Sequence, residues 1–226
     1  MVIYDRLHWL NGRVSNVYLY EDDGGLVLVD TGMWNRPDVL GYLKKINRNP
    51  QEITHILITH ADSDHIGNLA HLASLTEANI YASELAKNHI VEGSFATHGS
   101  GIVDRVQSWA RVDSVTEERI IALHDRDTLP IMGGLQVIAT PGHTPDHLAF
   151  HSLSVGILFA GDALNTKERK ITLNEAFLAH DYTQAKLSAQ RLAERTPALF
   201  ACGHGTPFLH DEEDLMMLFE SIRQEE

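Results

Sequence analysis

The sequence contains a single cysteine, few basic residues and no long apolar run. Cys202 cannot form a disulfide within the chain, which argues against a disulfide-stabilised secreted protein. The 18 Lys and Arg against 31 Asp and Glu give a net charge of −13, which disfavours nonspecific binding to nucleic acids or anionic membranes. No stretch approaches the roughly 18 apolar residues that span a bilayer. Residues 1–13 carry charges where a signal peptide needs an apolar run. We therefore expect a cytoplasmic protein with no nucleic-acid and no membrane partner.

What is present is the composition of an ordinary globular protein, with one exception. Hydrophobic residues make up 43% and charged residues 22% of the 226 residues, as in folded domains. The exception is histidine, with 14 copies. No linker, repeat or low-complexity tract divides the chain. The sequence therefore predicts one domain over residues 1–226, with 93–127 as a helical insertion packed over the functional site.

Predicted strands and helices alternate along the chain. Apolar runs and alternating patterns predict strands at 14–20, 26–29, 53–59, 80–82, 135–140, 147–151, 157–160 and 198–202. Helical spacing and capping residues predict helices after Pro37 and at 68–75, 84–91, 181–195 and about 211–223. This alternation predicts an α/β protein.

Potential metal ligands cluster where predicted strands end. The strand at 53–59 is followed by four of them within six residues: His60, Asp62, Asp64 and His65. His143, Asp162 and His204 each follow another predicted strand. In open α/β sheets, ligands bind outside the carboxyl ends of the strands. Imidazole and carboxylate donors together suit Zn, Fe or Mn.

These motifs resemble the metallo-β-lactamase superfamily of metal-dependent hydrolases. The resemblance covers most of the chain, from Asn16-Val17-Tyr18-Leu19 and Val29-Asp30-Thr31-Gly32 to Cys202-Gly203-His204-Gly205. It implies a four-layer αββα sandwich with two divalent metal ions at one edge of the sheets, and a small-molecule substrate. Carried over residue by residue, it implies that His60, Asp62 and His143 hold one ion, that Asp64, His65 and His204 hold the other, and that Asp162 bridges them.

One position departs from the family pattern H-x-H-x-D-H. Asp62 stands where the second histidine is usual. It could instead cap the helix that follows, since aspartate is a good N-cap residue. As a ligand, Asp62 adds a third carboxylate and lowers the formal charge of the site by one unit, which favours harder metals. Zn stays the expected metal, and the carboxylate at position 62 is the reason to keep Fe and Mn as alternatives.

The leading functional hypothesis is a dinuclear hydrolase. In it, a metal-bound hydroxide attacks an ester, thioester, lactone or amide, and Asp64 orients the hydroxide or takes its proton. One alternative is an iron-dependent oxidoreductase of the same superfamily, either persulfide dioxygenase-like or diiron. Another is a metal-binding module without turnover. Substrate, metal identity and oligomeric state stay open.

The other histidines divide by their surroundings in the sequence. His147 could position a ligand or simply be a hydrogen-bonded turn residue. We expect structural roles for His55, His71 and His151, whereas His89, His98, His124 and His180 could reach the site, and His8 and His210 have no neighbouring motif. Met33 and Trp34 either roof a substrate pocket or pack against the core, and Cys202 is expected in the core.

Overall fold

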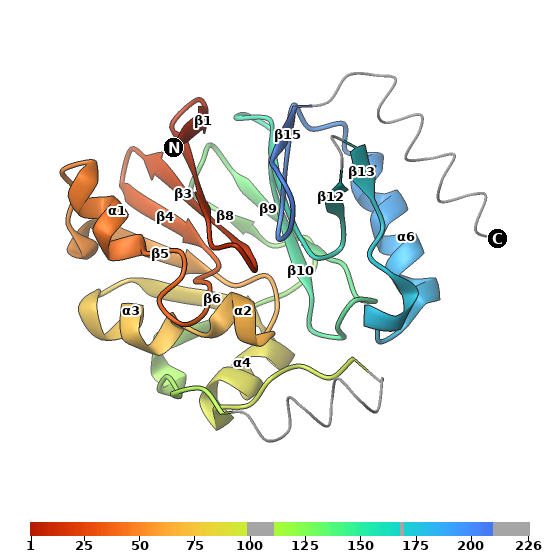
Figure 1. Ribbon diagram of the computed structural model, residues 1–226, viewed down its shortest axis with the longest axis horizontal. Coiled ribbons are helices and arrows are strands. Elements are labelled where there is room, and N and C mark those ends of the chain that lie inside the picture. Colours follow the sequence, from red (N-terminus) through yellow and green to blue (C-terminus); the bar gives the residue numbers. More distant parts are fainter. Residues whose placement is uncertain (99–110, 168–169, 210–226) are drawn as a thin grey trace. The chain divides into compact units, whose positions relative to one another are not determined.

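The computed structural model describes residues 1–98, 111–167 and 170–209 (Figure 1). These residues form two compact units, the first made of 1–96 and 111–123 and the second of 97–98, 124–167 and 170–209. Each unit is built around its own mixed β-sheet. Within the described ranges, no helix has the length and apolar character needed to cross a membrane.

The sheet of the first unit has seven strands in the spatial order β1 to β7. The strands are β1 (Val2–Tyr4), β2 (Leu7–Asn11), β3 (Asn16–Asp22), β4 (Gly25–Val29), β5 (Ile53–Leu57), β6 (Asn79–Ser83) and β7 (Ile120–Leu123). The first four pair antiparallel, and β4, β5, β6 and β7 pair parallel. Because β4 and β5 are parallel, their carboxyl ends lie at the same edge of the sheet.

The helices of the first unit pack on this sheet in one apolar cluster. They are α1 (Val39–Lys45), α2 (Ser63–Ile66), α3 (Leu69–Leu75) and α4 (Glu84–Glu92), with short 3₁₀ turns η1 (Pro50–Glu52) and η2 (Glu117–Arg119). Asp38 caps α1 by accepting from the Gly41 amide, and Ser83 caps α4 by accepting from the Ala86 amide. The cluster joins alternate strand residues to buried side chains of all four helices.

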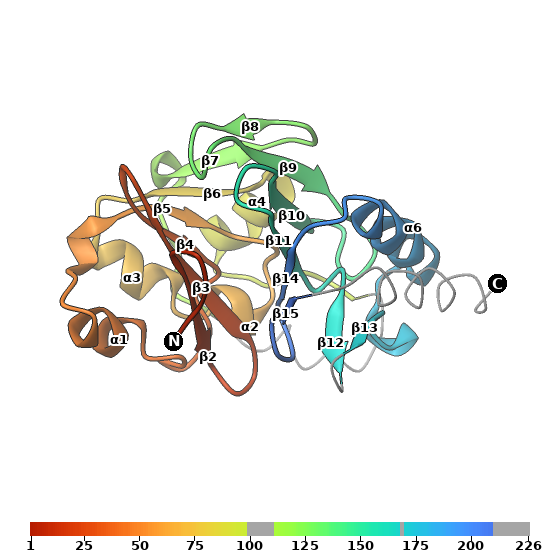
Figure 2. The same cartoon turned by 90° about the horizontal axis from the view of Figure 1, so that it is seen from above.

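The second unit has a six-stranded sheet in the order β15-β14-β11-β10-β9-β8. Its strands are β8 (Thr128–Leu129), β9 (Leu135–Ala139), β10 (Leu148–Ser152), β11 (Ile157–Gly161), β14 (Leu199–Cys202) and β15 (Phe208–Leu209). The β12 (Asn165–Lys167) and β13 (Lys170–Thr172) strands form a separate hairpin, and η3 (Ala176–Leu178) is a 3₁₀ turn. Helix α6 (Tyr182–Ala193) covers one face of the sheet through Ala189, Leu192 and Ala193 (Figure 2).

The direction of the strands in the second unit places three loops at one edge. Strand β10 pairs antiparallel with both β9 and β11, and β14 pairs parallel with β11. Strands β9, β11 and β14 therefore run in the same direction. Their carboxyl ends lead into the segments that carry His143, Asp162 and His204.

Most predicted elements are present, with ends that differ from the predicted ones by one or two residues. The hairpin of β3 and β4 is confirmed, whereas the strand predicted over 53–59 ends at Leu57 and the helix predicted over 181–195 ends at Ala193. Within the predicted helical insertion 93–127, the described residues contain only η2, β7 and irregular chain. Residues 120–123 form a strand instead of a helix, because they pair with β6 and bury Ile120 and Leu123. Residues 99–110 of that insertion and the predicted helix at 211–223 lie outside the described residues.

Candidate metal centre

The first group of predicted ligands lies at the carboxyl end of β5. Chain leaving this strand passes through Thr59 and then presents His60, Asp62, Asp64 and His65 up to and within the short helix α2. His60 and His65 are fully buried and Asp62 nearly so, and the two imidazole rings lie 4.1 Å apart between centroids. A ligand nitrogen of His60 and one of His65 lie within 4.8 Å of each other. The structure therefore gathers this group in one buried place.

Asp30 holds His65 in a defined orientation. It follows the neighbouring strand β4, and its Oδ2 lies 2.8 Å from His65 Nδ1. Asp30 Oδ1 also accepts from the Thr59 amide at 2.9 Å. Because an ionised carboxylate only accepts hydrogen bonds, Nδ1 of His65 must carry the proton. The lone pair of a neutral His65 is therefore on Nε2, where a metal ion would bind.

The same reasoning shows which ring nitrogen of His60 carries the proton. The Thr59 hydroxyl has one hydrogen, which it donates to Asp30 Oδ2 at 2.8 Å. It can then only accept from His60 Nδ1, which lies 3.0 Å away. His60 therefore also carries its proton on Nδ1 and its lone pair on Nε2. From the sequence, Asp30 is named only within the Val29-Asp30-Thr31-Gly32 motif and no role is assigned to Asp30 or Thr59, although Asp30 follows a buried strand just as the predicted ligands do.

Two carboxylates face these lone pairs. Asp62 Oδ2 lies 3.4 Å from His60 Nε2, and Asp64 Oδ2 lies 3.8 Å from His65 Nε2. Asp62 occupies the N-cap position of α2, yet its side chain makes no capping hydrogen bond. The capping role that the sequence left open is therefore not the one Asp62 performs.

The second group lies at the carboxyl ends of β9, β11 and β14. Asp162 is central to it, because its Oδ2 lies 2.9 Å from His204 Nε2 and 3.5 Å from His143 Nε2. His143 and Asp162 are buried, and the His204 side chain is 30% exposed. In all four of these contacts between a predicted histidine ligand and a predicted carboxylate ligand, the imidazole nitrogen is Nε2.

His147 positions Asp162 through the backbone. The Asp162 amide donates to His147 Nε2 at 2.9 Å, so this nitrogen carries a lone pair. The proton is then on Nδ1, which lies 2.7 Å from the Thr140 hydroxyl. Asn174 holds the other side of the same residue by donating to the Asp162 carbonyl oxygen at 2.6 Å. With both ring nitrogens engaged, His147 is a positioning residue and not a ligand.

The loop that carries His143 is fixed to helix α6. Amides of Asp181 and His180 donate to the carbonyl oxygens of Gly142 and His143, each at 2.9 Å. Gly142 adopts φ +139°, and a Cβ atom there would lie 2.2 Å from the Ala185 nitrogen. Only glycine fits this close approach, which sets where His143 is presented.

His98 packs directly against His143. The ring centroids are 4.8 Å apart with planes at 70°, and His98 is buried. Its Nδ1 lies 3.0 Å from the Leu178 carbonyl oxygen, which can only accept, so Nδ1 carries the proton. The sequence offered His98 only as one of several histidines able to reach the site.

Other residues named from the sequence have structural surroundings. His55 stacks on Tyr81 and hydrogen-bonds Thr54, and His8 is buried between Tyr42 and Glu21. His89 contacts Ser94, and His124 is exposed near Asp127. Cys202 is fully buried in β14, and this burial raises the pKa of its thiol to about 12, so it is a core residue as predicted. His210 lies outside the described residues.

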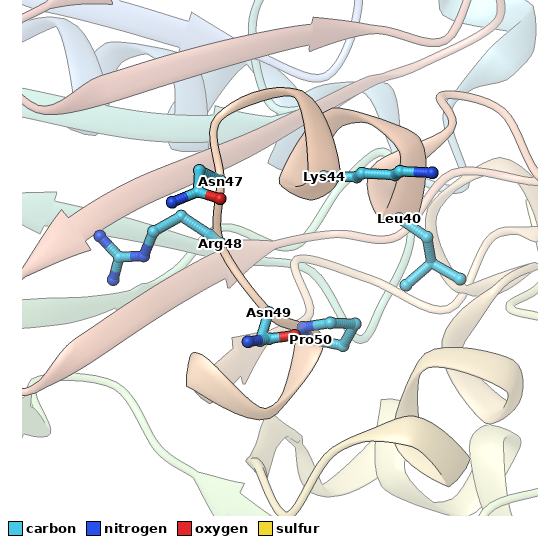
Figure 3. A pocket seen from close by; sticks show the side chains of 6 residues that line it. All are labelled: Leu40, Lys44, Asn47, Arg48, Asn49 and Pro50. Atoms are coloured by element: carbon cyan, nitrogen blue, oxygen red, sulfur yellow. The ribbon is translucent and has the colours of Figure 1, made fainter.

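A pocket of about 340 Å³ at the end of α1 holds none of the predicted ligands (Figure 3). Lys44 and Arg48 point to opposite sides in it. Arg48 is also bound to the carboxylates of Glu21 and Glu52, each at 2.7 Å. The pocket therefore offers no convergent catalytic groups.

The donor set of each group fits a divalent cation. Neutral imidazoles and carboxylates are the side chains that hold Zn, Fe and Mn. A lone pair on Nε2 and an ionised carboxylate oxygen repel each other across 3.4 Å, and a cation between them would turn this repulsion into two coordinate bonds. Burial strengthens the effect, because buried carboxylates need a compensating positive charge.

Comparison with known proteins gives the family. A model described as the metallo-beta-lactamase superfamily matches residues 10–204. The Bacillus subtilis protein YobT is 28% identical over 215 residues, which cover 89% of this chain and 87% of that protein. YflN of the same organism, described as a probable metallo-hydrolase, is 26% identical over 227 residues, covering 89% of this chain and 84% of that one.

Solved structures give the fold. The structure of a metallo-β-lactamase from Cronobacter sakazakii superposes with a TM-score of 0.76 at 18% identity and covers 100% of this chain and 91% of its own. This confirms the α/β fold of the metallo-β-lactamase type, with two mixed sheets flanked by helices. The family match extends over every predicted ligand from His60 to His204. By its sequence motifs, its fold and this match, the chain belongs to the metallo-β-lactamase superfamily.

Proposed function

We propose that the chain is a dinuclear metal-dependent hydrolase of small-molecule esters, thioesters, lactones or amides. Membership of the superfamily supports this proposal, as does the likeness to YflN, whose description is a probable metallo-hydrolase. In the proposed centre, His60, Asp62 and His143 hold one ion, and Asp64, His65 and His204 hold the second. Asp162 bridges the two. Zn is the expected metal, with Fe or Mn as alternatives.

The observation that carries the proposal is the set of Nε2 lone pairs that face carboxylates. His60 donates its Nδ1 proton to Thr59, and His65 donates its Nδ1 proton to Asp30. Their Nε2 atoms lie opposite Asp62 and Asp64. His55 in the same unit shows the structural alternative, because its ring stacks on Tyr81 and its Nδ1 hydrogen-bonds Thr54.

Divalent ions held there would supply a water of lowered pKa as the nucleophile and would polarise the substrate carbonyl. The chain's own contribution is to hold the ligands and to manage the proton. Asp64 is the proposed catalytic residue, because its side chain keeps 17% exposure, more than Asp62 or Asp162, and its carboxylate can accept a proton from the attacking water. Asp162 is oriented from both sides of its backbone by His147 and Asn174.

The test is hydrolysis by the purified protein loaded with Zn, Fe(II) or Mn, measured on a panel of esters, thioesters and lactones. We expect turnover that a chelator abolishes and added metal restores. His143→Ala should lose at least 100-fold in kcat/KM. His124→Ala is the matched control, because His124 is 74% exposed in the same unit, and it should retain wild-type activity.

Turnover that survives chelation would contradict the proposal. Oxygen uptake with a persulfide and no hydrolysis would replace it with the iron-dependent oxidoreductase. Bound metal without any turnover would leave the metal-binding module as the function.

A further inference from the structure

A second pocket in the first unit contains two arginines from separate loops. Its volume is about 300 Å³, and its walls are Asn11, Gly12 and Arg13 from the turn between β2 and β3, with Asn35, Arg36, Pro37 and Asp38 from the loop after β4. This is at the small end of the range for small-molecule sites. Nothing in the proposed hydrolase chemistry uses these residues.

The two loops are built against each other. The Gly12 amide donates to the Ser15 carbonyl oxygen at 3.0 Å, and a Cβ atom at Gly12 would lie 2.8 Å from Pro37 Cδ. In the second loop, Met33 and Arg36 exchange two backbone hydrogen bonds of 2.9 and 2.8 Å. The shape of the pocket is therefore fixed by backbone contacts, which lowers the entropic cost of binding a ligand.

Both loops contain residues with left-handed backbone. Arg13 has φ +70°, and Trp34 and Asn35 have φ +51° and +56°. Such conformations cost energy for residues other than glycine, so they persist only where surrounding contacts hold them. Asn35 is held by its amide, which donates to Asn68 Oδ1 at 2.7 Å.

Both loops are tied to the segment that carries the metal ligands of the first unit. The Ser15 hydroxyl donates to the backbone carbonyl oxygen of Asp64. Met33 packs against Gly67, where a Cβ atom would lie 2.8 Å from Met33 Cβ. The pocket is thus at the rim of the segment that holds Asp64 and His65.

Neither guanidinium group forms an ion pair with a carboxylate of residues 1–98, 111–167 or 170–209. The arginines that form ion pairs within these ranges are Arg6, Arg48, Arg126 and Arg191. Asp38, the one carboxylate of the pocket, accepts from the Gly41 amide at 2.8 Å as the cap of α1. With two arginines against this one carboxylate, the lining of the pocket has an excess of positive charge in a chain whose net charge is −13.

We propose that Arg13 and Arg36 form an anion-binding subsite that selects substrates with a carboxylate beyond the bond that is hydrolysed. The guanidinium fork matches a carboxylate in two parallel hydrogen bonds, which gives direction as well as charge. Trp34, which is 79% exposed and precedes Arg36 by two residues, offers an apolar surface for the rest of the substrate. This proposal names a substrate class and rests on the proposed hydrolase function.

The first arm of the test compares two esters of equal length, 4-nitrophenyl butyrate and the 4-nitrophenyl monoester of succinate. The measured quantity is the ratio of kcat/KM for the succinate ester to that for the butyrate ester. The double variant Arg13→Gln/Arg36→Gln should lower this ratio at least tenfold, mainly through KM. Arg126→Gln, an exposed arginine of the second unit, is the matched control and should leave the ratio unchanged.

The second arm needs no turnover. Succinate binding to the metal-loaded protein is measured by calorimetry, and the double variant should bind it at least tenfold more weakly than the wild type and Arg126→Gln. If neither ester is hydrolysed, the hydrolase proposal fails for esters, and this arm alone decides the subsite. Equal succinate affinity in the wild type and the double variant, or no binding to the wild type, would overturn the subsite.

Discussion

Hydrogen bonds to Nδ1 decide which histidines can bind a metal ion through Nε2. Thr59 accepts the hydrogen bond from His60 Nδ1, and Asp30 accepts the one from His65 Nδ1. His147 shows the opposite case, because the lone pair on its Nε2 accepts a hydrogen bond from the Asp162 amide and so cannot bind a metal ion. The ligand assignment therefore depends on the residues behind the ligands as much as on the ligands themselves.

Replacing Asp30 with asparagine tests this dependence. The amide can still accept one hydrogen bond, but it lacks the negative charge that makes His65 a stronger ligand. We expect metal affinity to fall by about 10-fold to 100-fold, as for other residues that orient metal ligands. Competition with a chelating dye measures the affinity.

Asp38→Asn is the control for this substitution, because Asp38 is an exposed cap residue and asparagine caps helices equally well. It should bind metal as the wild type does. Wild-type affinity in Asp30→Asn would show that the Asp30 charge does not act on His65.

His151 gives a pH-dependent stability. Burial in β10, with the nearby charge of Arg195 as the second cause, lowers the pKa of His151 to about 4. The unfolded chain takes up this proton near pH 6.5. As the pH falls from about 6.5 to about 4, the unfolded state gains a proton that the folded state does not, so the free energy of unfolding decreases.

The expected slope approaches about 1.4 kcal/mol per pH unit for a single proton. Urea unfolding at pH 7, 6 and 5 measures it in the wild type, in His151→Gln and in the exposed control His124→Gln. Only His151→Gln should lose part of the slope, since metal release at low pH affects all three proteins alike. Identical slopes in all three would show that His151 is not the buried neutral group.

At the level of single residues, the candidate ligands have a local signal in the sequence, whereas the residues that contact them have none. His60, His143 and the others stand beside glycines or in a dense run after predicted strands, which is a strong local signal. Asp30, Asn174 and Thr59 support them through contacts made only after folding. Such contacts join residues far apart in the chain, so no local spacing reveals them.

The elements of the second unit deliver its ligands through strand direction and helix position. Strands β9, β11 and β14 run the same way, and α6 fixes the loop after β9. The loop after β9 meets α6 at Gly142, where a Cβ atom would lie 2.2 Å from the Ala185 nitrogen.

Gly142→Ala should therefore disturb both the helix and the ligand loop. The added Cβ has no room, and alanine rarely adopts φ +139°. We expect a loss of about 1–3 kcal/mol in the free energy of unfolding, together with weaker metal binding through His143. Denaturant unfolding and dye competition measure the two effects.

Gly24→Ala in the β3–β4 turn is the matched control, because a Cβ atom at Gly24 would have nothing within 4 Å. It should change stability by less than about 0.5 kcal/mol. Normal metal affinity in a destabilised Gly142→Ala would contradict the role of this contact in presenting His143.

Elements with strong local signals were predicted, and those that depend on pairing were not. Asp181, predicted from the sequence to cap a helix, accepts from the Gln184 amide at the start of α6. The short strands β1, β12, β13 and β15 contain only two or three residues each, too few for a pattern. They form because a neighbouring strand offers hydrogen bonds to them.

For the whole molecule, the family fold followed from ordered motifs spread along the chain. Two mixed sheets with helices on them, and ligands at strand ends in both units, agree with the fold that the resemblance implied. The single-domain organisation over 1–226 and the role of 93–127 stay predictions.

The central claim is that His60, Asp62, Asp64, His65, His143, Asp162 and His204 together hold two divalent ions. Metal analysis of protein dialysed against buffered Zn tests it most directly, alongside Asp162→Ala, which removes the bridging ligand. The account predicts close to two ions per wild-type chain and a loss of at least one in Asp162→Ala. One ion or none in the saturated wild type, or two retained in Asp162→Ala, would contradict it.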